Sequence, residues 1–177
     1  MNSQNISGRE WLLKYVDGVV ERMSAIDTRI PMLFQDSFCG MSAWSSRLYA
    51  RYPGVNILIS THNYWFAAAG IYAQWLDPAI CGQAAFNVGD GLYPVFVGEW
   101  SLQTLYNNTL EGRKAVFEQQ RWAFAHFTQG GSMWTAKFNG LDAVDGEGTQ
   151  RDYWSYERMI DDGVVQPMLA NVTYCDV

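Results

Sequence analysis

Apolar and polar residues follow two different spacings along the chain, and these spacings predict helices and buried strands in turn. Apolar residues at helical spacing predict helices over residues 9–25, 41–52, 67–76, 111–127 and 153–160. Short continuous apolar runs predict four buried strands, centred near residues 33, 58, 96 and 134. The stretch between Asp77-Pro78 and Tyr93 is rich in Gly, Asn and Asp, and it is predicted to be a loop.

This order of elements, a helix followed by repeated pairs of strand and helix, is typical of a parallel sheet covered by helices. The predicted strands are spaced by about 25, 38 and 38 residues, and an eight-fold βα barrel has roughly 31 residues per unit. Four such units would make half of a barrel, although the periodicity alone also fits a doubly wound sheet. The predicted fold class is therefore α/β, with about four βα units in a single domain over residues 1–177.

Composition narrows the classes of function. Hydrophobic residues make up 49% of the 177 residues and charged ones 17%, which is typical of a folded domain with a real core. A net charge of -6 argues against a nucleic-acid partner, and no apolar run approaches the roughly 20 residues of a membrane span. No metal-ligand cluster or nucleotide-binding loop is present, so we expect no cofactor. Aromatic residues, at 15%, suit either a core or a carbohydrate site.

Cysteines and glycosylation sequons bear on the compartment. Cys39, Cys81 and Cys175 are an odd number, so one thiol is free or pairs outside the chain. The tripeptides that begin at Asn5, Asn107 and Asn171 are glycosylation sequons, which favour secretion. Residues 1–11 lack the basic and apolar regions of a signal peptide. We therefore expect the interior of an extracellular or cell-wall protein whose N-terminal part is absent.

All four predicted strands end in polar or aromatic residues. In parallel α/β folds the chemistry sits at the carboxyl ends of the strands. A single polar strand end marks only the point where the chain reaches the surface, but four together favour a site. The residues at these ends are Gln35-Asp36, Thr61 to Tyr64, Glu99-Trp100, and Trp134 with Lys137.

Several of these segments resemble glycoside hydrolase family 5, and most closely its fungal exo-β-1,3-glucanase branch. "VFVGEWS" looks like the strand-seven motif of that family, "STHNYWF" like its strand-six segment, and "MWTAKFNG" like its strand-eight segment. "IPMLFQDSFCGMSAW" resembles strand five and its loop, and "YWSYERMIDDGVV" resembles the terminal helix. The resemblance implies that the chain is the C-terminal half, strands five to eight, of a (β/α)8 TIM barrel.

The same resemblance implies a role for each of four residues. Glu99 would be the nucleophile of a retaining hydrolysis, His62 and Tyr64 would line the sugar site, and Trp134 would form a platform for the sugar. Three of them have a structural alternative: Glu99 could cap a strand end, His62 could be structural, and Trp134 could be core. Asp36 fits either substrate contact or turn capping equally well.

Further residues are open to two interpretations. Trp65, Phe66 and Trp100 fit outer sugar subsites or ordinary packing, and His126 is expected to lie at the surface or in packing.

The sequence also departs from that family. No Asn-Glu pair occurs, so the family's general acid is absent and we expect the chain to be inactive alone. Ala136 stands where the family has a second Trp, which leaves the glucan linkage open. Half a barrel would have two unpaired edges, so it should bind an N-terminal half, self-associate or remain poorly stable.

The predicted function is hydrolysis of β-glucan or a related oligosaccharide, of the exo-1,3-β-glucosidase type. The alternative is a non-catalytic carbohydrate-binding or scaffold protein derived from the same barrel. A third interpretation is an α/β protein of unrelated function.

Overall fold

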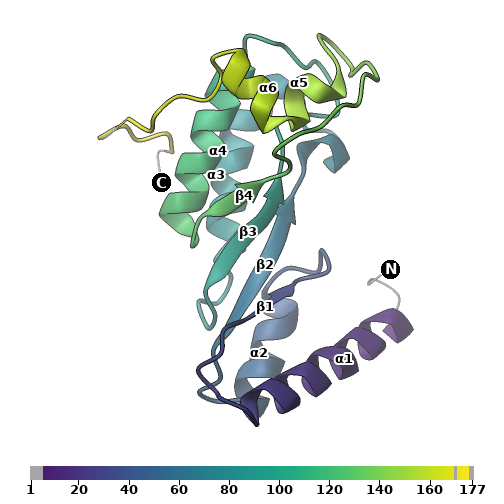
Figure 1. The fold of residues 1–177 in the computed structure, drawn as a ribbon, viewed down its shortest axis with the longest axis vertical. Helices are drawn as coiled ribbons and strands as arrows, with labels where there is room; N and C mark the ends of the chain where they lie inside the picture. The colour runs from purple at the N-terminus through teal and green to yellow at the C-terminus, as the bar shows by residue number, and fades with distance from the viewer. Residues whose placement is uncertain (1–5, 170, 176–177) are drawn as a thin grey trace.

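A computed structural model describes residues 6–169 and 171–175 of the chain. Its centre is one sheet of four parallel strands in the order β1-β2-β3-β4, seen running up the middle of Figure 1. The strands are β1 (Met32–Gln35), β2 (Ile57–Asn63), β3 (Val95–Trp100) and β4 (Gly131–Met133). Adjacent parallel strands in chain order, joined by helices, confirm the predicted α/β half-barrel.

Six α-helices accompany these strands in the described residues. Helices α1 and α2 lie at one end of the molecule, and α3 and α4 pack against each other toward the other end (Figure 1). The helices are α1 (Ile6–Ser24), α2 (Ser42–Arg51), α3 (Leu76–Asn87), α4 (Arg113–Phe127), α5 (Gln150–Trp154) and α6 (Tyr156–Asp161), with short 3-10 turns at Trp65–Ala67 and Ala73–Trp75.

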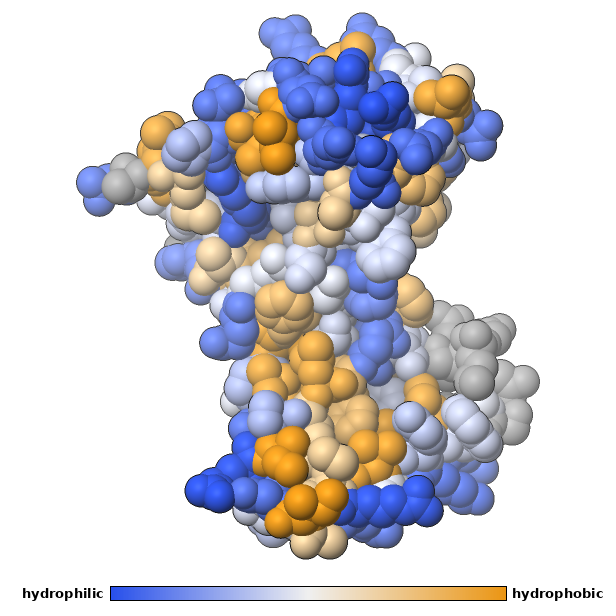
Figure 2. Space-filling view, viewed as in Figure 1, coloured by the Kyte–Doolittle hydropathy of each residue, from blue (hydrophilic) through white to orange (hydrophobic). Residues whose placement is uncertain are grey.

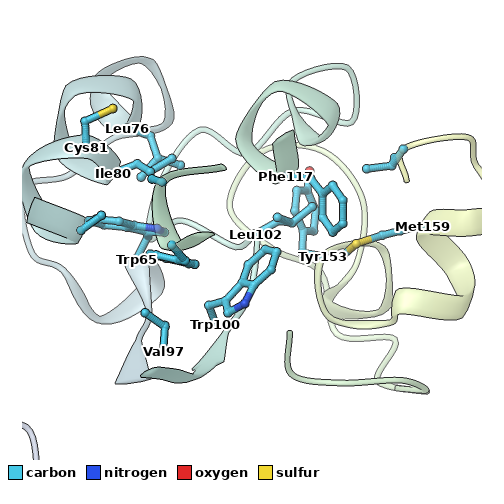
Figure 3. Close-up of a cluster of buried hydrophobic side chains, with 14 of the residues drawn as sticks. Trp65, Leu76, Ile80, Cys81, Val97, Trp100, Leu102, Phe117, Tyr153 and Met159 are labelled. Carbon is cyan, nitrogen blue, oxygen red and sulfur yellow. The ribbon is translucent and has the colours of Figure 1, made fainter. Parts of the chain in front are cut away.

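The covered face of the sheet is held by two hydrophobic clusters. The first lies under α1 and α2 and contains Val16, Val20, Met32, Met41, Trp44, Leu48, Ile57, Ile59, Tyr93 and Val95. The second joins β3, α3, α4 and the C-terminal helices, and Figure 3 shows its large side chains, among them Trp65, Trp100, Phe117, Tyr153 and Met159. The sheet is therefore packed along its whole length on one face.

The predicted helix over residues 67–76 and the predicted loop after it are wrong, because α3 occupies Leu76–Asn87. Asp77-Pro78 follows directly on the predicted helix, but in the structure it lies in the first turn of α3. Proline is tolerated there because the first backbone N–H groups of a helix have no partner within the helix. Ala84 and Ile80 are fully buried, so tertiary packing stabilises α3 despite Gly82 in its middle.

Two further boundaries differ from the prediction. The predicted helix over 153–160 is broken at Ser155, whose hydroxyl accepts a hydrogen bond from the Arg158 N–H and so begins α6. β4 ends at Met133, so Trp134 follows the strand rather than lying at its centre.

The second face of the sheet is open. Leu33 pairs with Leu58 across β1 and β2, and its side chain is 53% exposed, whereas its neighbour Met32 is buried. Figure 2 shows apolar side chains gathered in the lower half of the view, over the region of β1 and the lower ends of β2 and β3. In a whole barrel this face would be the interior, packed against the opposite strands. β1 and β4 are the two edges.

Cys81, in the middle of α3, forms a disulfide with Cys175, which ties the C-terminal segment to the second cluster. Cys39 is a free thiol. This answers the odd cysteine number: two thiols pair within the chain and the third does not. No helix in the described residues is both long and apolar enough to cross a membrane.

Candidate active site

A bulge in β3 turns Glu99 toward the open face of the sheet. Val95 and Val97 are buried under the helices, so unbroken alternation would place Glu99 on that same covered face. The register between β2 and β3 shifts here, and His62 pairs with Glu99 instead of Gly98. An extra residue of this kind re-aims the side chain that follows it. Glu99 therefore shares a face with His62.

Gly98 makes this arrangement possible. A side chain at position 98 would collide with the Ser60 hydroxyl, and its Cβ would lie 3.3 Å from His62 Nε2. Only a glycine lets β3 approach the side chains of β2 this closely. The Gly-Glu pair in the sequence is thus explained by packing next to the carboxylate.

The Glu99 carboxylate is held through one of its oxygens. The Tyr64 hydroxyl donates a hydrogen bond to Glu99 Oε2 at 2.6 Å, and His62 Nδ1 lies 3.2 Å from the same oxygen. Among the described residues, Oε1 has no hydrogen-bond partner. The Glu99 side chain is 29% exposed, so the carboxylate is neither buried nor fully solvated.

The protonation of Tyr64 is set by this contact. Burial, together with the hydrogen bond to the Glu99 carboxylate, raises the pKa of the Tyr64 phenol well above its ordinary value. The phenol therefore stays neutral across physiological pH and keeps its proton for Glu99.

Aromatic rings form a wall behind Tyr64. The Tyr64 ring stacks on Trp154, with centroids 5.4 Å apart and planes at 20°, and Phe66 packs against both rings. Trp154 is itself fixed, because its Nε1 donates to Gln103 Oε1 at 2.6 Å. Sequence reasoning missed Trp154. It lies at the end of α5, 55 residues beyond Glu99 in the numbering, and no strand-end pattern marks it.

Trp134 lies beside this group at the end of β4. Its ring is 46% exposed, and its backbone N–H donates to the Trp100 carbonyl at 2.8 Å. The next residue, Thr135, donates its N–H to the Trp154 carbonyl at 2.7 Å. The segment is therefore anchored to both the residue after Glu99 and the residue behind Tyr64. The structure brings Glu99, His62 and Tyr64 into direct contact and places Trp134 next to them through the backbone.

Other candidates have structural partners. Trp65 and Trp100 are both buried in the second cluster, where Trp65 Nε1 donates to Gln120 Oε1 at 2.9 Å. Lys137 forms an exposed ion pair with Glu157 at 3.2 Å. His126 stacks on a tryptophan at the surface of α4.

Asp36 is buried at the end of β1. Its carboxylate accepts hydrogen bonds from the backbone N–H groups of Phe38 and Gly40, at 3.0 and 3.2 Å. Burial raises the pKa of Asp36, and these hydrogen bonds partly offset the rise. The contacts are those of a turn cap. Across the described part of the chain, no group of three His, Cys, Asp or Glu residues could hold a metal ion.

Among the solved structures that are similar to this chain are those of two proteins. The crystal structure of AoRut matches with a TM-score of 0.83 and 37% identity, over 91% of this chain and 44% of that chain. The crystal structure of a rutinosidase from Aspergillus niger matches with a TM-score of 0.83 and 39% identity, over 90% of this chain and 44% of that chain. No protein-family model and no curated protein matches.

This chain spans less than half the length of the two structures it matches. Rutinosidases are glycoside hydrolases, so the predicted likeness to a glycosidase barrel is confirmed. Family 5 and its exo-glucanase branch stay a prediction.

Proposed function

We propose that the chain is the C-terminal half of the barrel of a retaining glycosidase, and that Glu99 is its nucleophile. The observation that carries this proposal is the Glu99 carboxylate on the open face, with Tyr64 and His62 at Oε2 and no partner at Oε1 among the residues that the structure describes. The contacts at Oε2 fix the orientation of the carboxylate and leave Oε1 positioned for attack. Trp134 is proposed as the platform for the sugar ring.

The reaction proceeds in two steps. Glu99 Oε1 forms a bond to the anomeric carbon, the glycosidic C–O bond breaks, and the leaving oxygen takes a proton from a second carboxyl group. Water, deprotonated by that second group, then releases the sugar from Glu99. Retaining enzymes place the two carboxyl groups about 5–5.5 Å apart. Among the described residues, no second carboxylate contacts Glu99, so hydrolysis requires one from the other half of the barrel.

Two candidate substrates are proposed, one from the structural match and one from the sequence resemblance. The match to the A. niger rutinosidase makes a rutinoside the first substrate to test. The sequence resemblance to exo-β-1,3-glucanases makes β-1,3-glucan the second. Both carry a β-linked glucose at the bond to be cleaved.

A carbohydrate-binding protein without catalysis is the second candidate. It is favoured by the lack of a second carboxylate at Glu99 within the described residues, while the aromatic wall of Tyr64, Phe66 and Trp154 is complete. Such a protein would bind β-glycosides and hydrolyse none. We also propose that the protein is secreted; the Cys81–Cys175 disulfide supports an oxidising compartment.

The test is covalent trapping in a completed barrel, by which we mean this chain joined to the remaining βα units of the A. niger rutinosidase. A 2-deoxy-2-fluoro-β-glucosyl fluoride forms the glycosyl-enzyme bond faster than water breaks it. Mass spectrometry of the peptides should find one added fluoroglucosyl group on Glu99. Glu99→Gln should take up none, and Glu111→Gln, a change to an exposed glutamate, should label fully.

Labelling of another carboxylate, or an active enzyme whose product has inverted configuration, would contradict the nucleophile assignment. A completed barrel that binds glycosides but hydrolyses none would favour the carbohydrate-binding candidate.

A further inference from the structure

The loop between β3 and α4 holds two consecutive asparagines in opposite environments. Asn108 is 3% exposed, and its side chain bonds the backbone and hydroxyl of Thr104 and the Asp145 carbonyl. Asn107 is exposed, and its amide group has no hydrogen-bond partner among the described residues. Its left-handed φ of 58° is one that asparagine adopts more readily than most residues. The loop is therefore built around Asn108, and Asn107 presents its amide to solvent.

This loop is anchored to the segment that precedes α5. The Asn107 N–H donates to Asp145 Oδ1 at 2.7 Å, and the Asn108 N–H donates to the Asp145 carbonyl at 2.9 Å. The Leu110 N–H donates to Glu147 Oε2 at 3.0 Å. A group attached to the Asn107 side chain is therefore held at a defined place on the surface.

Asn107 begins one of the three glycosylation sequons of the chain, and Thr109 completes it. Thr109 is also exposed, and its hydroxyl accepts a hydrogen bond from the Gly112 N–H at 3.2 Å. A hollow of about 320 Å³ opens beside the acceptor, with Gln74, Asn107 and Thr109 among its lining residues. The folded chain thus leaves room for a sugar ring joined to Asn107 Nδ2.

Exposed aromatic rings lie next to the acceptor, and we call Tyr72, Trp75 and Tyr106 the aromatic strip. The Tyr106 ring stacks on Tyr72, with centroids 5.1 Å apart and planes at 28°, and Trp75 meets Tyr72 edge-on at 5.0 Å. Tyr106 and Trp75 are 39% and 54% exposed. The C–H face of a sugar ring packs well on such rings, and a sugar tethered to the next residue has a high effective concentration there.

We propose that Asn107 carries an N-linked glycan, and that the first N-acetylglucosamine of this glycan packs on the aromatic strip. The donor is a lipid diphosphate-linked oligosaccharide. Its anomeric carbon forms a bond to Asn107 Nδ2, the C–O bond to the diphosphate breaks, the lipid diphosphate leaves, and one amide proton passes to a base. This inference rests on the proposed secretion and is independent of the role of Glu99.

The first test measures the modification itself. The completed barrel is exported from yeast through an added signal peptide, and its peptides are treated with peptide-N-glycosidase in heavy-oxygen water. Asn107 should be converted almost entirely to labelled aspartate. Thr109→Ala should abolish the label, whereas Thr109→Ser, which keeps the sequon and the hydroxyl, should retain it. Because the added signal peptide imposes export, an unlabelled Asn107 would overturn the site itself and would leave the proposed secretion untouched.

The second test measures the packing of the first sugar. An endoglycosidase that leaves one N-acetylglucosamine should preserve the Tm of the completed barrel, and complete removal should lower it by about 1–3 °C. This loss should be smaller in Asn107→Gln and in Tyr106→Ala, which lack the glycan and the neighbouring ring. Asn107→Gln should fold normally, because the side chain bonds nothing in the described residues. An equal loss in all three proteins would overturn the packing on the aromatic strip.

Discussion

The acidic residues at the ends of β1 and β3 occupy equivalent places and have different roles. Asp36 and Glu99 each follow an apolar strand of a parallel sheet, and both were candidates for substrate contact on that ground. Asp36 is 3% exposed, and its oxygens accept backbone N–H groups of its own loop. Glu99 has a 29% exposed side chain; within the described part of the chain, side chains contact one of its oxygens and none contacts the other.

Asp36 and Glu99 have different roles because the neighbouring backbone differs: a loop follows Asp36, and a bulge precedes Glu99. Beyond Asp36, Ser37 and Phe38 adopt left-handed φ values of 56° and 59°, which fold the loop back over the carboxylate. Before Glu99, the bulge at Gly98 moves the side chain to the open face. The same residue type at the same place in a βα unit can therefore hold a loop or face a substrate. Local backbone geometry decides which.

The largest expected effect contrasts the two acids directly. In the completed barrel, Glu99→Gln should lower kcat by at least about a thousandfold, because the amide cannot form the glycosyl-enzyme bond. Asp36→Asn should lower kcat by less than about tenfold, since a turn cap affects the reaction only through position. Initial rates on p-nitrophenyl β-rutinoside measure both. Comparable losses in the two variants would remove the distinction between them.

A smaller loss is expected when the support of Glu99 is removed. Tyr64→Phe keeps the ring stacked on Trp154 but deletes the hydrogen bond to Glu99 Oε2. A hydrogen bond to a charged group contributes about 1.5–3 kcal/mol, so kcat should fall by roughly ten- to a hundredfold. Initial rates on p-nitrophenyl β-rutinoside measure the loss, and an unchanged kcat would refute this role.

The positions of the two acids at strand ends were predictable from the sequence, but the bulge that turns Glu99 to the open face was not. The strand ends at Asp36, His62 and Glu99 follow from apolar runs, because burial of a parallel strand leaves a continuous signal. The bulge at Gly98 depends on how closely β2 and β3 approach, which is a tertiary property. Trp154 was missed for the same reason, since only the folded chain brings α5 against Tyr64.

The two acids should rank in the opposite order for the free energy of unfolding, where a change at Asp36 should have the larger effect. Asp36→Ala leaves the Phe38 and Gly40 N–H groups without their acceptor, which should lower the free energy of unfolding by about 1–3 kcal/mol. Glu99→Gln should change it by less than about 0.5 kcal/mol, as for most partly exposed substitutions. Urea unfolding of the completed barrel, followed by circular dichroism, gives both values. If Glu99→Gln is the more destabilising change, then Glu99 has a structural role as well.

The smallest effect is a pH dependence that belongs to Asp36 alone. Burial raises the pKa of Asp36 above its ordinary value of 3.8, so the folded state holds this proton more tightly than the unfolded state. The contribution of protonated Asp36 to the free energy of unfolding is complete below the pKa that Asp36 has in the unfolded state. It is lost as pH rises through the pKa of Asp36 in the folded state. The difference in unfolding free energy between the unchanged protein and Asp36→Asn should therefore shrink as pH is raised from about 3.5 to 7. Urea titrations at each pH measure it. A difference that grows with pH would mean that the loop N–H groups outweigh burial, and that Asp36 is a stronger cap than its surroundings imply.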